Sequence, residues 1–189
     1  MSVARASEPH PLLALARALD AAEIPFMVVG AHALVVHGTP RFSADIDVAV
    51  HLPVEQRKAV RDALKPAGYR GFEWVADEWG KRWRCLGPED LPVELFFAAE
   101  TELHRREFER RVVLEVLGRK MPFVSPEDLV LRKLVNCRMR RYQDFDDAVG
   151  VVRVQGRRLD GGYLRRHCGV HRVCALLDQA LAAASAEGD

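Results

Sequence analysis

Apolar residues recur along the chain with two different spacings. In "PLLALARALDAA", Leu12, Leu15 and Leu19 follow the spacing of one helix face. Shorter runs that are uninterrupted or alternate with polar residues predict strands instead. The predicted N-terminal elements are a helix over residues 11–22, a strand over 24–30, a short helix over 31–38, a strand over 45–50 and an amphipathic helix over 54–68.

The middle of the chain favours strands, and its end favours helices. The predicted elements are a hairpin of strands 69–75 and 81–86, a strand over 92–97, a charged helix over 101–110 and two β-rich runs at 111–117 and 119–124. Ser125, followed by Pro126 and Asp128, resembles a capped helix start. The rest reads as helical, with breaks near Gly156 and Gly161–Gly162. We therefore expect an α/β part over residues 1–124 and a helical part over 125–189.

Two carboxylates interrupt the strand "DIDVAV". Successive side chains of a strand alternate between faces, so Asp45 and Asp47 share one face and could converge on a common point. Hard cations such as Mg²⁺ prefer oxygen ligands and would offset their repulsion. Glu94 lies within another apolar strand, "PVELFF". If the two strands are neighbours, three carboxylates suit a two-metal site for phosphoryl transfer.

Paired aspartates on a strand often form only its solvent face, and for this short motif alone that explanation is the more common one. The upstream stretch "MVVGAHALVVHG" favours a functional role for the two aspartates. It places an apolar strand, Gly30 and a helix start directly before the acids. Glycine lets backbone approach a triphosphate closely, and N–H groups at a helix N-terminus bind phosphate.

These segments together resemble the nucleotidyltransferase fold of the DNA polymerase β-like superfamily. Within it, "VVGAHALVVHGTPRFSADIDVAV" is most similar to the AbiEii-like nucleotidyltransferases of abortive-infection and toxin–antitoxin systems. "VSPEDLVLRKL" and "RRYQDFDDAV" resemble later family segments, so the likeness covers about residues 10–155. It implies an α+β fold, with a mixed sheet flanked by helices and a C-terminal helical part.

The resemblance also implies roles for individual residues. Those matching the catalytic and metal-binding positions are Asp45, Asp47 and Glu94, the last standing where aspartate is usual. Those matching nucleotide-binding positions are Gly30, Ala31, Arg41, Ser43, Lys133 and Asp144. Ala31 replaces the usual second glycine or serine of the phosphate-binding turn. From the sequence pattern alone, a lysine beside an apolar helix stripe such as Lys133 is more often solvated.

The implied activity is Mg²⁺-dependent transfer of a nucleoside monophosphate from an NTP to a hydroxyl, with two metal ions and release of pyrophosphate. The family suggests an RNA acceptor such as a tRNA 3′ end, a toxin-like role and a cognate antitoxin as partner. Two alternatives stay open: an antibiotic-modifying nucleotidyltransferase, and an inactive module that binds a nucleotide or a partner.

Composition restricts these options only a little. The formal net charge of the 189 residues is +1, so RNA contact would need a local patch. Five basic residues between Arg132 and Arg141 are one candidate, and a solvated helix face explains them as well. The apolar runs are too short for a membrane span, and no signal peptide is evident. We therefore expect a cytoplasmic protein whose four cysteines are reduced.

Two further motifs have structural explanations. Trp74, Trp79 and Trp83 lie among basic residues and could stack on bases, but cross-strand packing in the hairpin is favoured. "HCGVHRVC" has only superficial zinc spacing, and Gly169 is expected to interrupt a helix there. We assign no metal site to this motif.

Overall fold

A computed structural model describes residues 10–77, 80–98 and 101–186 of the chain. Its centre is a seven-stranded sheet in the order β3-β4-β5-β2-β1-β7-β6. The strands are β1 (Phe26–Val28), β2 (Ile46–Val50), β3 (Arg70–Asp77), β4 (Gly80–Leu86), β5 (Pro92–Phe97), β6 (Val112–Val116) and β7 (Arg119–Phe123).

The sheet is mixed, as the resemblance implied. β2 runs parallel to β5 and antiparallel to β1, while β1 runs parallel to β7. Antiparallel pairing joins β3 to β4, β4 to β5, and β6 to β7. The parallel pairing of β2 with β5 matters most for function, because it places the strand that follows Asp45 beside the strand that carries Glu94.

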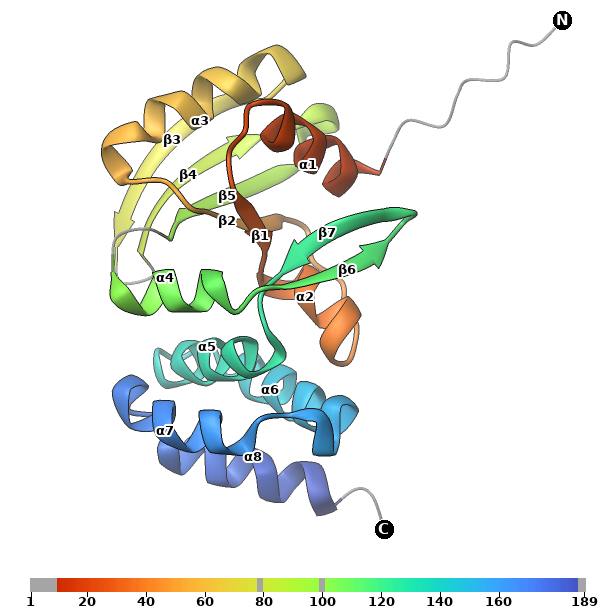
Figure 1. The fold of residues 1–189 in the computed structure, drawn as a ribbon, viewed down its shortest axis with the longest axis vertical. Coiled ribbons are helices and arrows are strands. Elements are labelled where there is room, and N and C mark those ends of the chain that lie inside the picture. The colour runs from red at the N-terminus through yellow and green to blue at the C-terminus, as the bar shows by residue number, and fades with distance from the viewer. Residues whose placement is uncertain (1–9, 78–79, 99–100, 187–189) are drawn as a thin grey trace, which may run out of the picture.

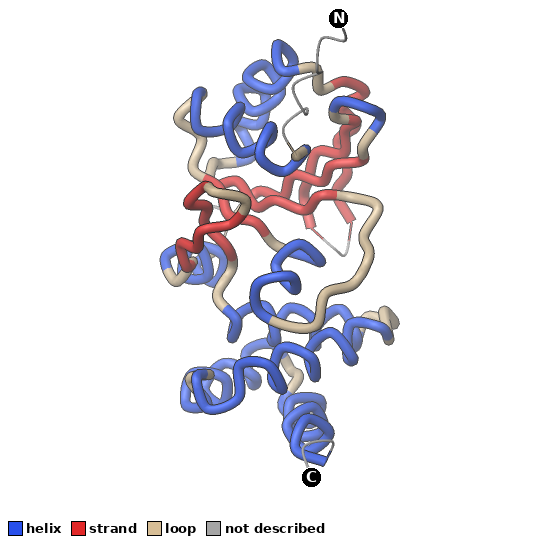
Figure 2. The backbone as a smooth tube through the Cα atoms, turned by 90° about the vertical axis from the view of Figure 1, so that its right-hand side faces the viewer, coloured by secondary structure: helices blue, strands red, loops and turns tan. Residues whose placement is uncertain are grey.

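Helices lie at both ends of the molecule, with the sheet between them (Figures 1 and 2). The α-helices are α1 (Pro11–Ala21), α2 (Gly30–His37), α3 (Arg57–Leu64), α4 (Glu102–Glu109), α5 (Pro126–Arg138), α6 (Gln143–Gln155), α7 (Gly161–His171) and α8 (Cys174–Ala186). Short 3₁₀ turns are η1 (Val54–Gln56), η2 (Lys65–Ala67), η3 (Pro88–Asp90) and η4 (Gly156–Arg158). Among the described residues, no helix combines the length and apolarity needed to cross a membrane.

One face of the central strands is fully apolar. In β2, Ile46, Val48 and Val50 are at most 2% exposed, and their register partners on β5 are also apolar. The same buried cluster includes residues of α1 and α3, such as Leu15 and Leu64. Burying each such side chain contributes roughly 1.5–3 kcal/mol, so this face anchors the sheet and leaves the opposite face for Asp47.

Most predicted elements are present with small shifts in their bounds. The predicted helix over 54–68 is divided into η1, α3 and η2, and it ends at Gly68, whose φ is +88°. The hairpin aromatics pack as favoured: the rings of Trp74 and Trp83 meet edge to face with centroids 5.2 Å apart. Trp79 lies outside the described residues. Gly169 does not interrupt α7, so that expectation was wrong.

The expectation of four reduced cysteines was also wrong. Cys168 in α7 and Cys174 at the start of α8 form a disulfide, with Cα atoms 4.8 Å apart. Arg172 adopts a left-handed conformation between the two helices and reverses the chain there. This reversal, which helical periodicity does not predict, brings the two thiols together. Cys85 and Cys137 are free and buried.

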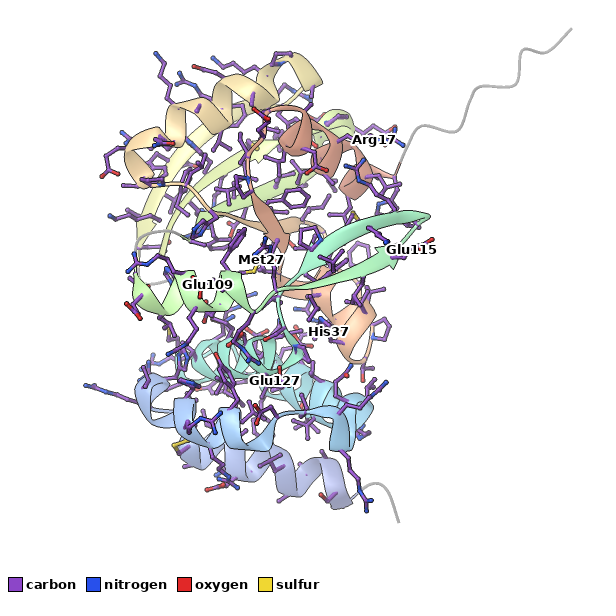
Figure 3. All side chains as sticks on the ribbon, viewed as in Figure 1. Arg17, Met27, His37, Glu109, Glu115 and Glu127 are labelled. Atoms are coloured by element: carbon purple, nitrogen blue, oxygen red, sulfur yellow. A yellow bond between two sulfur atoms is a disulfide. The ribbon has the colours of Figure 1, made fainter. Side chains whose placement is uncertain are left out.

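From α5 onward, every described element is helical or a 3₁₀ turn. This part joins the sheet through buried polar contacts. His37 at the end of α2 donates from Nε2 to the carbonyl of Val124 at 2.8 Å, directly before α5 begins (Figure 3 labels His37). The division into separate domains at residue 124 stays a prediction.

A second group of buried polar contacts surrounds Asp128, whose side chain accepts several hydrogen bonds. Asp128 is 1% exposed. Its backbone N–H donates to the N-cap hydroxyl of Ser125 at 3.2 Å. Its carboxylate accepts from that hydroxyl and from the Tyr163 hydroxyl, both at 2.6 Å, and from Nε of Arg110 at 3.3 Å. The network therefore ties the end of α4 to α5 and α7.

We predict that Asp128→Ala lowers the free energy of unfolding by about 3 kcal/mol, because the buried hydroxyls of Ser125 and Tyr163 lose their acceptor and Arg110 keeps only Glu127 as a partner. Urea denaturation followed by circular dichroism measures the change. Glu115→Ala, an exposed change on β6, should cost less than about 0.5 kcal/mol. Equal losses in the two variants would contradict the prediction.

Candidate active site

The turn between β1 and α2 contacts the carboxylate of Asp47. α2 begins at Gly30, whose φ is +62°. Residues other than glycine rarely adopt this backbone conformation. A Cβ atom added to Gly30 would lie 2.0 Å from Oδ2 of Asp47. Only glycine therefore lets this carboxylate lie against the start of the helix.

Asp45 precedes β2, and a short-range hydrogen bond positions it. Ser43 donates its hydroxyl to Oδ1 of Asp45 at 2.6 Å. Both residues lie in the segment that connects α2 to β2, while Asp47 is held within the strand. The serine hydroxyl thus fixes one carboxylate of the pair, and the sheet fixes the other.

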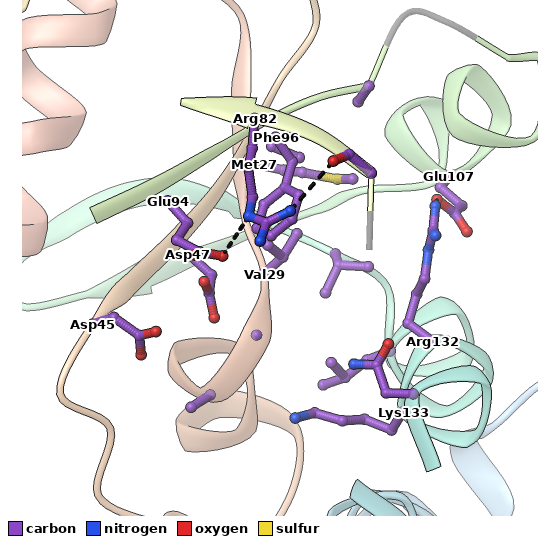
Figure 4. Close-up of a pocket in the computed structure, with 18 of the residues that line it drawn as sticks. Met27, Val29, Asp45, Asp47, Arg82, Glu94, Phe96, Glu107, Arg132 and Lys133 are labelled. Carbon is purple, nitrogen blue, oxygen red and sulfur yellow. Dashed lines mark hydrogen bonds and ion pairs between the residues drawn. The ribbon is translucent and has the colours of Figure 1, made fainter. Parts of the chain in front are cut away.

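Glu94 lies beside Asp47, as the sequence predicted for neighbouring strands, because the two residues are register partners in the parallel pair β2 and β5. Figure 4 shows Asp45, Asp47 and Glu94 on the same side of the site. Two arginines of β4 contact Glu94: Nε of Arg84 lies 2.7 Å from Oε1, and Nε of Arg82 lies 3.1 Å from Oε2. Both oxygens of Glu94 are therefore engaged.

The three acids influence one another electrostatically. Burial, and after it the negative charges of Asp45 and Glu94, raise the pKa of Asp47 from 3.8 to about 7. Lys133 and Arg141 act in the opposite direction but do not compensate. A carboxylate held in this unfavourable environment is one that a cation would stabilise.

The donor set fits a divalent cation at the aspartate pair better than at all three acids. Among the described residues, no group of three or more histidine, cysteine, aspartate or glutamate side chains is arranged so that it could hold a metal ion. The ion pairs of Glu94 with Arg82 and Arg84 give the physical reason, because a metal would have to compete with two guanidinium groups. Asp45 and Asp47 are the residues that could hold Mg²⁺ in this conformation.

Lys133 is buried at the side of the site, not solvated. It is 4% exposed, and its Nζ lies 2.9 Å from Asp144 and 2.7 Å from Asp147. Arg41 donates from Nε to both oxygens of Asp147 at 3.1 Å and approaches Asp144 at 4.0 Å. This cluster connects the segment before the aspartates to α5 and α6.

A cavity of about 540 Å³ brings these groups together. Its wall includes eight of the nine predicted site residues, namely Gly30, Ala31, Arg41, Ser43, Asp45, Asp47, Glu94 and Lys133. Asp144 is the ninth and is 1% exposed, and it contacts the cavity wall through lining residues such as Lys133 and Arg41. Among the described lining residues, basic side chains outnumber acidic ones.

Three residues of the site were missed from the sequence. Arg82 and Arg84 alternate along "KRWRCL", and pairing β4 with β5 would have placed Arg84 opposite Glu94 and Arg82 on the same face, opposite Phe96. Asp147 follows Asp144 by three residues, one turn along α6, and this spacing places both on one helix face. The spacing of these residues is therefore visible in the sequence. Their place in the site becomes clear only when the strand order and the helix packing are known.

No protein-family model and no curated protein matches the sequence. The structure, however, is similar to solved structures. One is ANT(2")-Ia in complex with adenylyl-2"-tobramycin, with a TM-score of 0.60 and 14% identity over 85% of this chain and 94% of that chain. The chain has the nucleotidyltransferase fold.

Two further structures agree with this fold. An antigenic nucleotidyltransferase-like protein from Paracoccidioides brasiliensis has a TM-score of 0.53 and 17% identity, over 91% of both chains. The lincosamide antibiotic adenylyltransferase LnuA with lincomycin bound has a TM-score of 0.52 and 12% identity, over 75% of this chain and 94% of that chain. The nucleotidyltransferase fold therefore includes most of the sheet and helices described above.

We predict that Gly30→Ala lowers the free energy of unfolding by about 3 kcal/mol, because the methyl group would overlap the Asp47 carboxylate and the residue would keep its positive φ. Gly118→Ala is the matched control. Gly118 also has positive φ, +72°, but no atom lies within 4 Å of an added Cβ. It should lose only about 1 kcal/mol from backbone strain. Losses of similar size in denaturant titrations would contradict the close contact.

We also predict a pH-dependent gain in stability for Asp47→Asn. Because the folded-state pKa of Asp47 is raised to about 7, the wild-type protein loses stability as the pH rises from about 4 to 7. In the presence of EDTA, Asp47→Asn should be more stable than wild type by roughly 2 kcal/mol at pH 8, and this gain should shrink toward pH 4. Thermal unfolding across that range measures it, and a gain independent of pH would contradict it.

Proposed function

We propose that the protein is a Mg²⁺-dependent nucleotidyltransferase that moves a nucleoside monophosphate from an NTP to a hydroxyl group. The observation that carries the proposal is the contact between the Gly30 turn and Asp47, within a cavity that Asp45 and Glu94 also line. A phosphate-binding turn and acidic residues at one point are what this reaction needs.

Several groups that line the cavity would bind the triphosphate of the NTP. The N-terminus of α2, at Gly30 and Ala31, faces the cavity and would bind phosphate oxygens through backbone N–H groups. Arg41 and Lys133 also line this cavity, and their ion pairs with Asp144 and Asp147 hold them in place. These groups orient the triphosphate relative to the acids.

Asp45, kept in place by Ser43, and Asp47 would hold Mg²⁺, which neutralises charge on the phosphates when bound. The acceptor oxygen forms a bond to the α-phosphorus, the bond to the bridging oxygen breaks, and pyrophosphate leaves. Glu94 is the candidate to take the proton of the acceptor hydroxyl. Opening one of its arginine pairs would free a carboxylate oxygen for that step, or for a second metal ion.

Two acceptor classes have separate support. The AbiEii-like sequence motifs favour RNA, such as a tRNA 3′ end, together with a toxin-like role and a cognate antitoxin. The structures of ANT(2")-Ia with adenylyl-2"-tobramycin and of LnuA with lincomycin favour an antibiotic hydroxyl instead. The same transfer chemistry serves both classes.

We predict that the wild-type protein transfers label from an α-labelled NTP in the presence of Mg²⁺, and that Asp47→Asn lowers the rate by roughly a thousandfold. Each NTP would be tested with total RNA, tobramycin and lincomycin, and labelled products separated by electrophoresis or chromatography. Asp62→Asn, a half-exposed carboxylate of α3, is the control and should be fully active.

The pattern of label distinguishes the candidate functions. Label on RNA would support a toxin-like enzyme that modifies RNA. Label on tobramycin or lincomycin would support an antibiotic-modifying enzyme. Calorimetric binding of NTP without transfer to any acceptor would support the inactive module and contradict the enzyme. Equal activity of wild type and Asp47→Asn would contradict the assigned site.

A further inference from the structure

A second hollow, of about 440 Å³, lies beside the first cavity. The two share Asp45, Arg84 and Glu94 in their walls. The remaining lining residues of the second hollow come from β3, the end of β4 and the start of β5. Two of the three acids assigned to the reaction, Asp45 and Glu94, therefore lie on the boundary between two spaces, which suits a reaction with two substrates.

A row of charged side chains leads from the first space into the second. Strand register pairs Asp47 with Glu94, Glu94 with Arg84, and Arg84 with Glu73. Residues paired in this way point to the same face of a sheet. The row thus crosses β2, β5, β4 and β3 and ends at Glu73 on the outermost strand.

The two spaces have opposite charge. Basic side chains outnumber acidic ones around the first cavity, which suits the triphosphate. Around the second hollow the charged residues are three acids, Asp45, Glu73 and Glu94, and one base, Arg84, which already pairs with Glu94 at 2.7 Å. Glu73 is exposed, and its side chain forms no hydrogen bond or ion pair with another described residue.

We propose that the second hollow binds the acceptor, and that the acceptor is a hydroxylated molecule that carries protonated amino groups. Glu73 binds an amino group while the reacting hydroxyl lies at Glu94. A polyanion such as RNA would meet unfavourable charge at Glu73 and Asp45. This inference rests on the proposed transferase function and adds the chemical class of the acceptor to it.

Titration calorimetry with tobramycin tests the inference, since tobramycin carries several amino groups on hydroxylated rings. Glu73→Lys should lower the affinity for tobramycin roughly tenfold, because it replaces an attraction by a repulsion. The milder Glu73→Gln should lower it about threefold. The affinity for ATP should not change in either variant. Glu115→Lys, the same charge change at an exposed site of β6, should bind tobramycin as the wild type does (Figure 3 labels Glu115).

Unchanged tobramycin affinity in Glu73→Lys, or no binding of tobramycin to the wild-type protein, would overturn the assignment. Circular dichroism of each variant would verify that it is folded. If the transferase proposal is wrong, NTP binding and label transfer are absent. The tobramycin titrations of the wild type and of Glu73→Lys still show whether the second hollow binds an amine. Transfer to RNA that Glu73→Lys leaves unchanged would keep the reaction and reject the acceptor class.

Discussion

The site depends on the contact between the Gly30 turn and the carboxylate of Asp47. A side chain at Gly30 would occupy the space of that carboxylate, and the positive φ of the turn would strain any other residue. The contact brings the N–H groups of a helix start and a negative charge to the same point. Burial and the negative charges of Asp45 and Glu94 leave Asp47 with a raised pKa, and a bound cation would stabilise such a carboxylate most.

Basic side chains pair with the other acids around the site. Arg82 and Arg84 pair with Glu94 from the next strand, while Lys133 pairs with Asp144 and with Asp147 behind it. Breaking such buried pairs by removing one partner is costly. The pair that crosses from the segment before β2 to the helical end of the molecule is Arg41 with Asp147 of α6, at 3.1 Å, and it lies at the wall of the cavity.

The first cavity and the second hollow differ in charge, so each suits a different substrate. The first cavity lies between the sheet and α5, where Lys133 and Arg132 supply positive charge (Figure 4). The second lies over β3 and β4, where Glu73 is exposed. An anionic donor and a cationic acceptor would thus reach Asp45 and Glu94 from different sides. Such an arrangement suits an in-line displacement, because attacking and leaving groups lie on opposite sides of the phosphorus.

The sequence by itself determined most of the helices and strands, and which face of β2 carries the acidic side chains. Local spacing is enough to show that Ile46 and Val48 face a core and that Asp47 does not, and glycine at position 30 indicates an unusual backbone. Only the tertiary structure decided the neighbours of these residues. The pairing of Glu94 with two arginines and the burial of Lys133 depend on how strands and helices pack together, and the disulfide of Cys168 depends on the left-handed turn at Arg172. Local periodicity encodes none of these.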